Sequence, residues 1–124
     1  VAPWGEDEWD AVLERYWAEH EWIGIDQRAR ALSLCYLNEA PTREDVLELA
    51  PAVASSDFER AQAARIEAIA DAVDQAAAGT FWLATQTLFD PEEDMDWRIV
   101  ALVDVPASDE ANRVALATIT VGVR

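Results

Sequence analysis

His20 is the only histidine among the 124 residues, and the glutamates Glu19 and Glu21 flank it. A carboxylate beside an imidazole raises the pKa of the ring and can prepare it to act as a general base. A nucleophile for such a base is not evident, since the chain contains no Gly-x-Ser-x-Gly segment. We therefore interpret His20 as a partly buried or exposed helix residue, with a catalytic base as the alternative.

A second group of polar residues is the acidic run from Asp90 to Asp96, in which acids stand at alternate positions. This spacing is typical of a calcium-binding loop, whose template requires Gly at the sixth position and Glu at the twelfth. Met95 and Ala101 occupy those two positions. The sequence therefore predicts a solvated acidic hairpin loop, and we expect neither a bound metal nor a cofactor.

Composition and charge exclude several function classes. All nine basic residues are arginine, so the chain lacks the lysine of a phosphate-binding P-loop or a Schiff-base enzyme. The single cysteine, Cys35, excludes a disulfide framework, and we expect it in the core rather than as a reactive thiol. A net charge of −16 repels nucleic-acid phosphates and acidic membranes, so we expect neither as a direct partner. No secretory signal is visible, which favours the cytoplasm.

The elements that must position these residues are indicated by periodicity and by capping residues. Apolar residues three and four apart predict helices, two of which begin at the capping patterns of Thr42 and Ser56. Alternating apolar residues and β-branched segments predict strands. The predicted elements are helices over 4–21, 42–50 and 57–78, and strands over 28–38, 80–89, 97–105 and 114–123. The long helix is expected to face the core with Phe58, Arg65, Ile69 and Val73.

This order of elements predicts a single α+β domain over 1–124, with a helical part over 1–79 and a three-stranded meander over 80–124. Short connections favour antiparallel neighbours, and the strand within 28–38 can join the meander as a fourth. We expect three helices packed on one face of this curved antiparallel sheet. Such an arrangement is compatible, by analogy, with a cone-shaped fold of the nuclear-transport-factor-2 or cystatin type.

The chain contains six tryptophans, and most of them are expected to pack the helices onto the sheet. A curved sheet can also enclose an apolar pocket that holds a few convergent polar groups. The residues expected to line such a pocket are Tyr16, Trp17, His20, Trp82 and Trp97.

Several segments resemble a known family. The residues that carry the resemblance are Tyr16–Arg30, Trp82–Pro91 (WLATQTLFDP), Asp94–Val105 (DMDWRIVALVDV) and Ala107–Ala111 (ASDEA). They resemble the C-terminal domain of unknown function found in actinobacterial DEAD/DEAH-box, Ski2-like helicases. The ATP-binding and unwinding motifs of such helicases belong to their motor domains and are not found here, so the resemblance implies no catalytic residue.

The resemblance implies a terminal appendage that is tethered to an RNA- or DNA-translocating motor. The first hypothesis is a non-catalytic accessory domain that contacts a basic protein partner or the motor domains of the parent helicase. The candidate contact surface comprises Trp97, Asp104, Asp109 and Glu110. The alternatives are a small-molecule-binding or enzymatic domain that uses the aromatic pocket, and an acidic mimic of nucleic acid.

Overall fold

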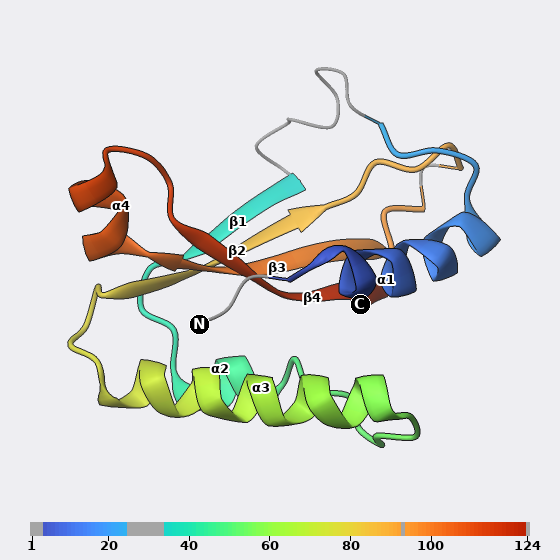
Figure 1. Cartoon of the computed structure of the whole chain (residues 1–124). Coiled ribbons are helices and arrows are strands. Elements are labelled where there is room, and N and C mark those ends of the chain that lie inside the picture. The colour runs from blue at the N-terminus through green and yellow to red at the C-terminus, as the bar shows by residue number, and fades with distance from the viewer. Residues whose placement is uncertain (1–3, 25–33, 93, 124) are drawn as a thin grey trace.

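The computed structural model describes residues 4–24, 34–92 and 94–123. Within these residues, four helices and four strands confirm the predicted α+β class and the four-stranded antiparallel sheet (Figure 1). In chain order, the elements are α1 (Glu6–Glu19), β1 (Cys35–Asn38), α2 (Arg43–Leu47), α3 (Asp57–Gln75), β2 (Phe81–Thr87), β3 (Trp97–Asp104), α4 (Val105–Ala111) and β4 (Leu116–Val123).

The sheet has the order β1-β2-β3-β4, so each strand pairs antiparallel with the strand before it in the chain. The three C-terminal strands form the predicted meander, with a register shift in β3 between Val100 and Ala101. The strand predicted within 28–38 is present as β1, which begins at Cys35 and adds to the outer side of β2. Residues 28–33 of that prediction lie outside the described residues.

The two predicted capping patterns begin helices α2 and α3. The Thr42 hydroxyl accepts the backbone N–H of Asp45 at 3.2 Å, and the Asp45 carboxylate accepts the backbone N–H of Thr42 at 2.9 Å. The Ser56 hydroxyl likewise accepts the backbone N–H of Glu59 at 3.1 Å. These contacts satisfy N–H groups that have no partner within the helix, so the local sequence is sufficient to start both helices.

Helix α4 was not predicted, because the sequence pattern makes residues 106–113 a short connection between the strands predicted over 97–105 and 114–123. The Asp104 carboxylate accepts the backbone N–H of Ala107 at 3.0 Å, and Pro106 lies in the first turn of the helix. Asn112 ends the helix in a left-handed conformation, with φ of 53°. An acidic N-cap, an early proline and a terminal asparagine are helix signals that the sequence contained.

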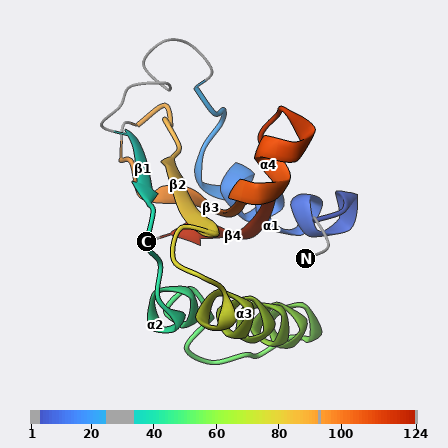
Figure 2. The same cartoon turned by 90° about the vertical axis from the view of Figure 1, so that its left-hand side faces the viewer.

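The core is divided between the two faces of the sheet. One cluster joins α2 and α3 to the sheet through Val46, Ile66, Ile69, Ala70, Val73, Leu83, Val100, Leu102 and Ile119. A second cluster joins α1 to the sheet through Val12, Tyr16, Leu88, Trp97 and Val121, and also includes Trp4. Figures 1 and 2 show α2 and α3 on one side of the sheet, with α1 and α4 on the other.

The expectation that all helices cover one face is therefore wrong. Adjacent residues of a strand point to opposite faces, and Ile99 and Val100 of β3 pack in the two different clusters. Because β3 is almost continuously apolar, both of its faces must be covered, and helices on a single side cannot do this.

Ile69 and Val73 of α3 are buried as predicted, but the predicted inward residue Arg65 is replaced in the core by Ile66. Ile66 is fully buried, whereas its neighbour Arg65 is partly exposed and donates to the carbonyl oxygen of Thr118 at 2.7 Å. The stem of the arginine can lie along the core while its guanidinium reaches a strand carbonyl, which explains its apparent place in the stripe. Among the described residues, no helix combines the length and apolar character that crossing a bilayer requires.

Candidate functional site

His20 lies in a segment that is attached to the loop between β2 and β3. Helix α1 ends at Glu19, and the chain continues as extended backbone from His20. The hydroxyl of Tyr16 donates to the carbonyl oxygen of Trp22 at 2.7 Å, and the Trp22 ring stacks on Phe89. The backbone N–H of Gly24 donates to the carbonyl oxygen of Phe89 at 2.6 Å. These contacts hold His20 against the acidic run that follows Phe89.

Gly24 allows this close approach because it has no side chain. A Cβ atom at this position would lie 2.8 Å from a ring carbon of Phe89 and 3.1 Å from its carbonyl oxygen. We expect Gly24→Ala to lower the free energy of unfolding by about 1–3 kcal/mol, as overpacking usually does. The matched control is Gly122→Ala, where a Cβ would meet nothing within 4 Å. Equal urea midpoints for the two variants would contradict the expected clash.

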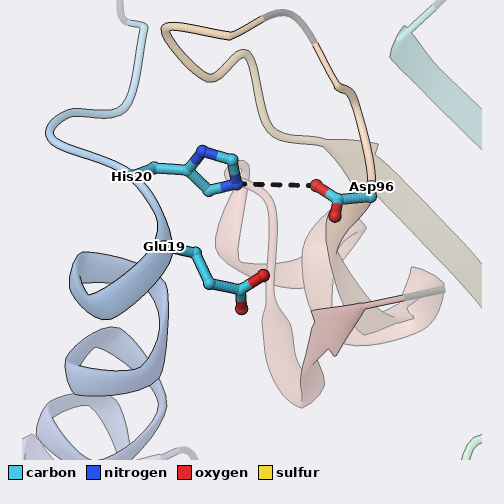
Figure 3. Close-up of side chains that lie close together, drawn as sticks. All are labelled: Glu19, His20 and Asp96. Carbon is cyan, nitrogen blue, oxygen red and sulfur yellow. Dashed lines mark ion pairs between the residues drawn. The ribbon is translucent and has the colours of Figure 1, made fainter.

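Three carboxylates surround the imidazole of His20. The Nδ1 atom lies 2.6 Å from Glu92 Oε2 and 3.8 Å from Asp90 Oδ1. On the other side of the ring, the Nε2 atom lies 3.6 Å from Asp96 Oδ1 (Figure 3). His20 itself is only 4% exposed, so a buried imidazole is enclosed by acids that are distant from it in the sequence. The interpretation of His20 as a partly buried or exposed helix residue is corrected, since it is the first residue after α1 and is buried in this cluster.

Asp90 anchors the acidic loop from inside. Its side chain is fully buried, and its two oxygens accept the backbone N–H groups of Asp94 at 3.0 Å and Met95 at 2.9 Å. Burial opposes ionisation of this carboxyl, but the backbone N–H donors and the neighbouring His20 outweigh it and hold the pKa of Asp90 below its ordinary value.

The prediction of a fully solvated loop is therefore wrong at Asp90. The loop also makes a sharp turn without glycine, because Met95 itself adopts the left-handed conformation, with φ of 55°. The two N–H groups bound by Asp90 offset the cost of this conformation.

The electrostatic environment favours a charged imidazole. The hydrogen bond to Glu92 is the largest contribution and raises the pKa of His20 above its ordinary value. Burial acts in the opposite direction, and the charges of Asp90, Glu92 and Asp96 add to the increase. Burial, followed by the same three carboxylates, raises the pKa of Tyr16 to about 12, so the phenol remains a hydrogen-bond donor at neutral pH.

The chemistry open to this cluster is proton or cation binding rather than nucleophilic attack. Imidazole nitrogen and carboxylate oxygen are also metal ligands. Two groups bring one such atom per residue within 4.8 Å of one another: Glu19, His20 and Asp96, and His20, Asp90 and Asp94.

The structure brings together most of the residues expected to line an aromatic pocket. Tyr16 contacts Trp17, His20 and Trp97 through its ring, at centroid distances of 5.2, 5.0 and 5.3 Å. Trp82 belongs to the far half of β2, where it opposes Val103. Tyr16 and Trp97 are buried and packed in the α1 cluster, so these rings support the position of His20.

The residues of the candidate contact surface do not all lie on the surface of the protein. Trp97 is only 2% exposed, which removes its ring from any docking surface. Asp104 is used as the N-cap of α4, and Asp109 and Glu110 are exposed on that helix. Cys35, which was expected in the core, is exposed because β1 lies at the edge of the sheet.

Sequence reasoning noted Asp90 as part of the acidic run but missed that its side chain is buried and anchors the loop. The available signal was an aspartate followed by proline at the end of an apolar strand, where a side chain often accepts backbone N–H groups of the next turn. Glu92 and Asp96 were noted only as part of an acidic run, and no local pattern connects them to His20.

Comparison with known families adds one finding. The family described as "Domain of unknown function (DUF3516)" matches residues 1–121. The chain belongs to this family. No curated protein and no solved structure matches the DUF3516 chain. The match includes both α1 and the loop between β2 and β3, so the whole His20 cluster belongs to the DUF3516 domain.

Proposed function

We propose that the DUF3516 chain is a non-catalytic interaction domain that works in the cytoplasm as the C-terminal appendage of a helicase-like protein. The resemblance of several segments to helicase C-terminal domains supports this context. The observation that carries an interaction role is the apolar outer edge of the sheet at β1, where Tyr36 is 67% exposed and Leu37 is 46% exposed.

The two edges of the sheet differ in how they are covered. At β4, side chains of α3 bind the strand, since Gln62 and Arg65 donate to the carbonyl oxygens of Ile119 and Thr118. At β1, consecutive apolar residues point to opposite faces, so the edge is apolar on both sides. An outer strand of this kind favours the addition of a strand from a partner.

The charge of the chain favours a basic partner. A net charge of −16 raises the rate and specificity of encounter with a positively charged surface. Motor domains that bind RNA or DNA must present such surfaces to the phosphates. The parent motor is therefore the partner that we propose.

The test is isothermal titration of the chain with the motor segment of a Ski2-like helicase supplied in trans. We expect saturable binding that weakens as salt is added, because part of the attraction is between exposed charges. The double variant Tyr36→Ser, Leu37→Ser is expected to bind at least about tenfold more weakly. Val53→Ser is the matched control, since Val53 is 76% exposed but lies in the loop before α3.

Two further measurements can contradict the proposal. We expect the isolated chain neither to hydrolyse ATP nor to bind single-stranded RNA at physiological salt. Micromolar RNA binding in a titration would reject the proposal that this acidic domain binds proteins rather than nucleic acids. Turnover of ATP by the chain would reject a non-catalytic role.

A further inference from the structure

The Nε2 atom of His20 has no hydrogen-bond partner among the described residues. His20 is 4% exposed, and its Nε2 atom is buried without a hydrogen-bond partner. The nearest acidic atom is Asp96 Oδ1, which is also buried and also lacks a hydrogen-bond partner. Figure 3 shows Nε2 pointing at the Asp96 carboxylate, with Glu19 close by on the same side. Two buried polar atoms therefore face one another 3.6 Å apart without a hydrogen bond between them, and they form an ion pair only when the ring is protonated.

The contact that Nδ1 makes on the opposite side of the ring determines whether Nε2 carries a hydrogen or a lone pair. Nδ1 lies 2.6 Å from Glu92 Oε2, and a carboxylate can only accept, so Nδ1 carries a hydrogen. In the neutral ring, Nε2 then presents a lone pair toward a carboxylate oxygen, which is also an acceptor. Two acceptors in contact repel each other unless a cation or a proton lies between them.

The distance between the two acceptors fits a shared metal ion. Nε2 and Asp96 Oδ1 are 3.6 Å apart, which is too long for a hydrogen bond. Two ligands that are each about 2.1 Å from a tetrahedral zinc ion are about 3.4 Å apart. The carboxylate of Glu19 also has an oxygen within 4.8 Å of both atoms.

The second acidic group beside His20 is less suited to binding a metal ion. That group uses Asp90 and Asp94, but both oxygens of Asp90 already accept backbone N–H groups. Glu92 occupies the Nδ1 atom on this side. A carboxylate on the non-ligating nitrogen of a histidine is the arrangement that orients metal-binding imidazoles in proteins. The Nδ1 side therefore supports the ring, and the Nε2 side is free to bind.

We propose that Glu19, His20 and Asp96 bind a divalent transition-metal ion of the zinc type, with Glu92 orienting the imidazole. One nitrogen and two carboxylate ligands suit such an ion, whereas calcium takes six to eight oxygen ligands. Glu19 is exposed, so the remaining coordination position is accessible to water. The ion would connect the end of α1 to the residue before β3. The site is independent of the partner surface at β1.

The test is titration of the metal-free chain with Zn²⁺ in competition with a chromophoric chelator at mildly alkaline pH. We expect one equivalent to bind, and the same site to give visible d–d absorption with Co²⁺. Glu19→Gln and Asp96→Asn are each expected to weaken zinc binding by about tenfold or more, because each removes a charged ligand. Glu19 is exposed, so its variant keeps the fold even if a change at Asp96 does not.

The matched controls are Glu21→Gln and Asp94→Asn, which remove exposed acids beside the proposed ligands and should bind zinc as the parent chain does. Full zinc affinity in Glu19→Gln would overturn the proposed ligand set. So would a loss of binding in Asp94→Asn that Glu19→Gln does not share. The absence of saturable zinc binding would overturn the proposed metal site.

Discussion

Replacing Asp90 by Asn is expected to lower the free energy of unfolding by about 2–4 kcal/mol. The Asp90 side chain is fully buried and accepts the backbone N–H groups of Asp94 and Met95. An asparagine amide can accept only on its oxygen, so one of the two part-buried N–H groups would face another donor. The same substitution removes a negative charge beside His20, and that charge contributes to the raised pKa of the imidazole.

Urea denaturation followed by tryptophan fluorescence measures this loss. Asp94→Asn is the matched control, because it makes the same chemical change at an exposed position of the same loop. We expect the control to change stability by less than about 0.5 kcal/mol. If both variants unfold at the same urea concentration, the buried hydrogen bonds of Asp90 do not stabilise the loop as described.

The sign of the pKa shift adds a pH dependence to this comparison. The pKa of Asp90 is lower in the folded chain than its ordinary value, so the folded state favours the ionised form. The resulting stabilisation is complete above the unfolded pKa of about 3.9 and is lost as the pH falls through the folded value. The difference in stability between the parent chain and Asp90→Asn should therefore shrink as the pH falls through the folded pKa of Asp90.

Replacing Ile66 by Ala is expected to lower the free energy of unfolding by about 2–5 kcal/mol, because it leaves a cavity in the larger core. Ile66 is 0% exposed and packs in the cluster that joins α3 to the sheet. Alanine has a higher helix propensity than isoleucine, so the loss cannot come from the helix itself. Thermal or urea unfolding measures the change directly.

The control for Ile66 is Glu67→Ala, which shortens the next side chain on the exposed side of α3. We expect this control to be nearly neutral. The pair also tests which side of α3 faces the sheet, because the sequence pattern had placed Arg65 rather than Ile66 inward. A neutral Ile66→Ala would mean that the helix is rotated away from the arrangement described here.

Much of the secondary structure could be predicted because its causes are local. Ser56 and Glu59 lie within one turn, and their contact begins α3 wherever the helix packs. The three C-terminal strands follow from β-branched residues separated by short connections, which favour antiparallel pairing. The same local argument also accounts for α4, whose signals at Asp104, Pro106 and Asn112 were present but were interpreted as a turn.

The faces of the sheet and the environment of Trp97 could not be predicted in the same way. A continuously apolar strand indicates that both faces are covered but not which helix covers each one. The sequence placed Trp97 both in the candidate contact surface and in the candidate pocket, although most tryptophans were expected to pack the core. Trp97 is buried against the ring of Tyr16. Tyr16 belongs to α1, which is far from β3 in the sequence.

The sequence by itself determined the α+β class, the helix starts at Thr42 and Ser56, and the antiparallel order of the last three strands. Only the tertiary structure decided that His20 is enclosed by Asp90, Glu92 and Asp96. His20 and Glu92 are separated by 72 residues, and no periodicity relates positions so far apart. They meet because Trp22 and Gly24 attach the segment after α1 to Phe89 in the loop after β2, and these contacts form only when both segments are folded.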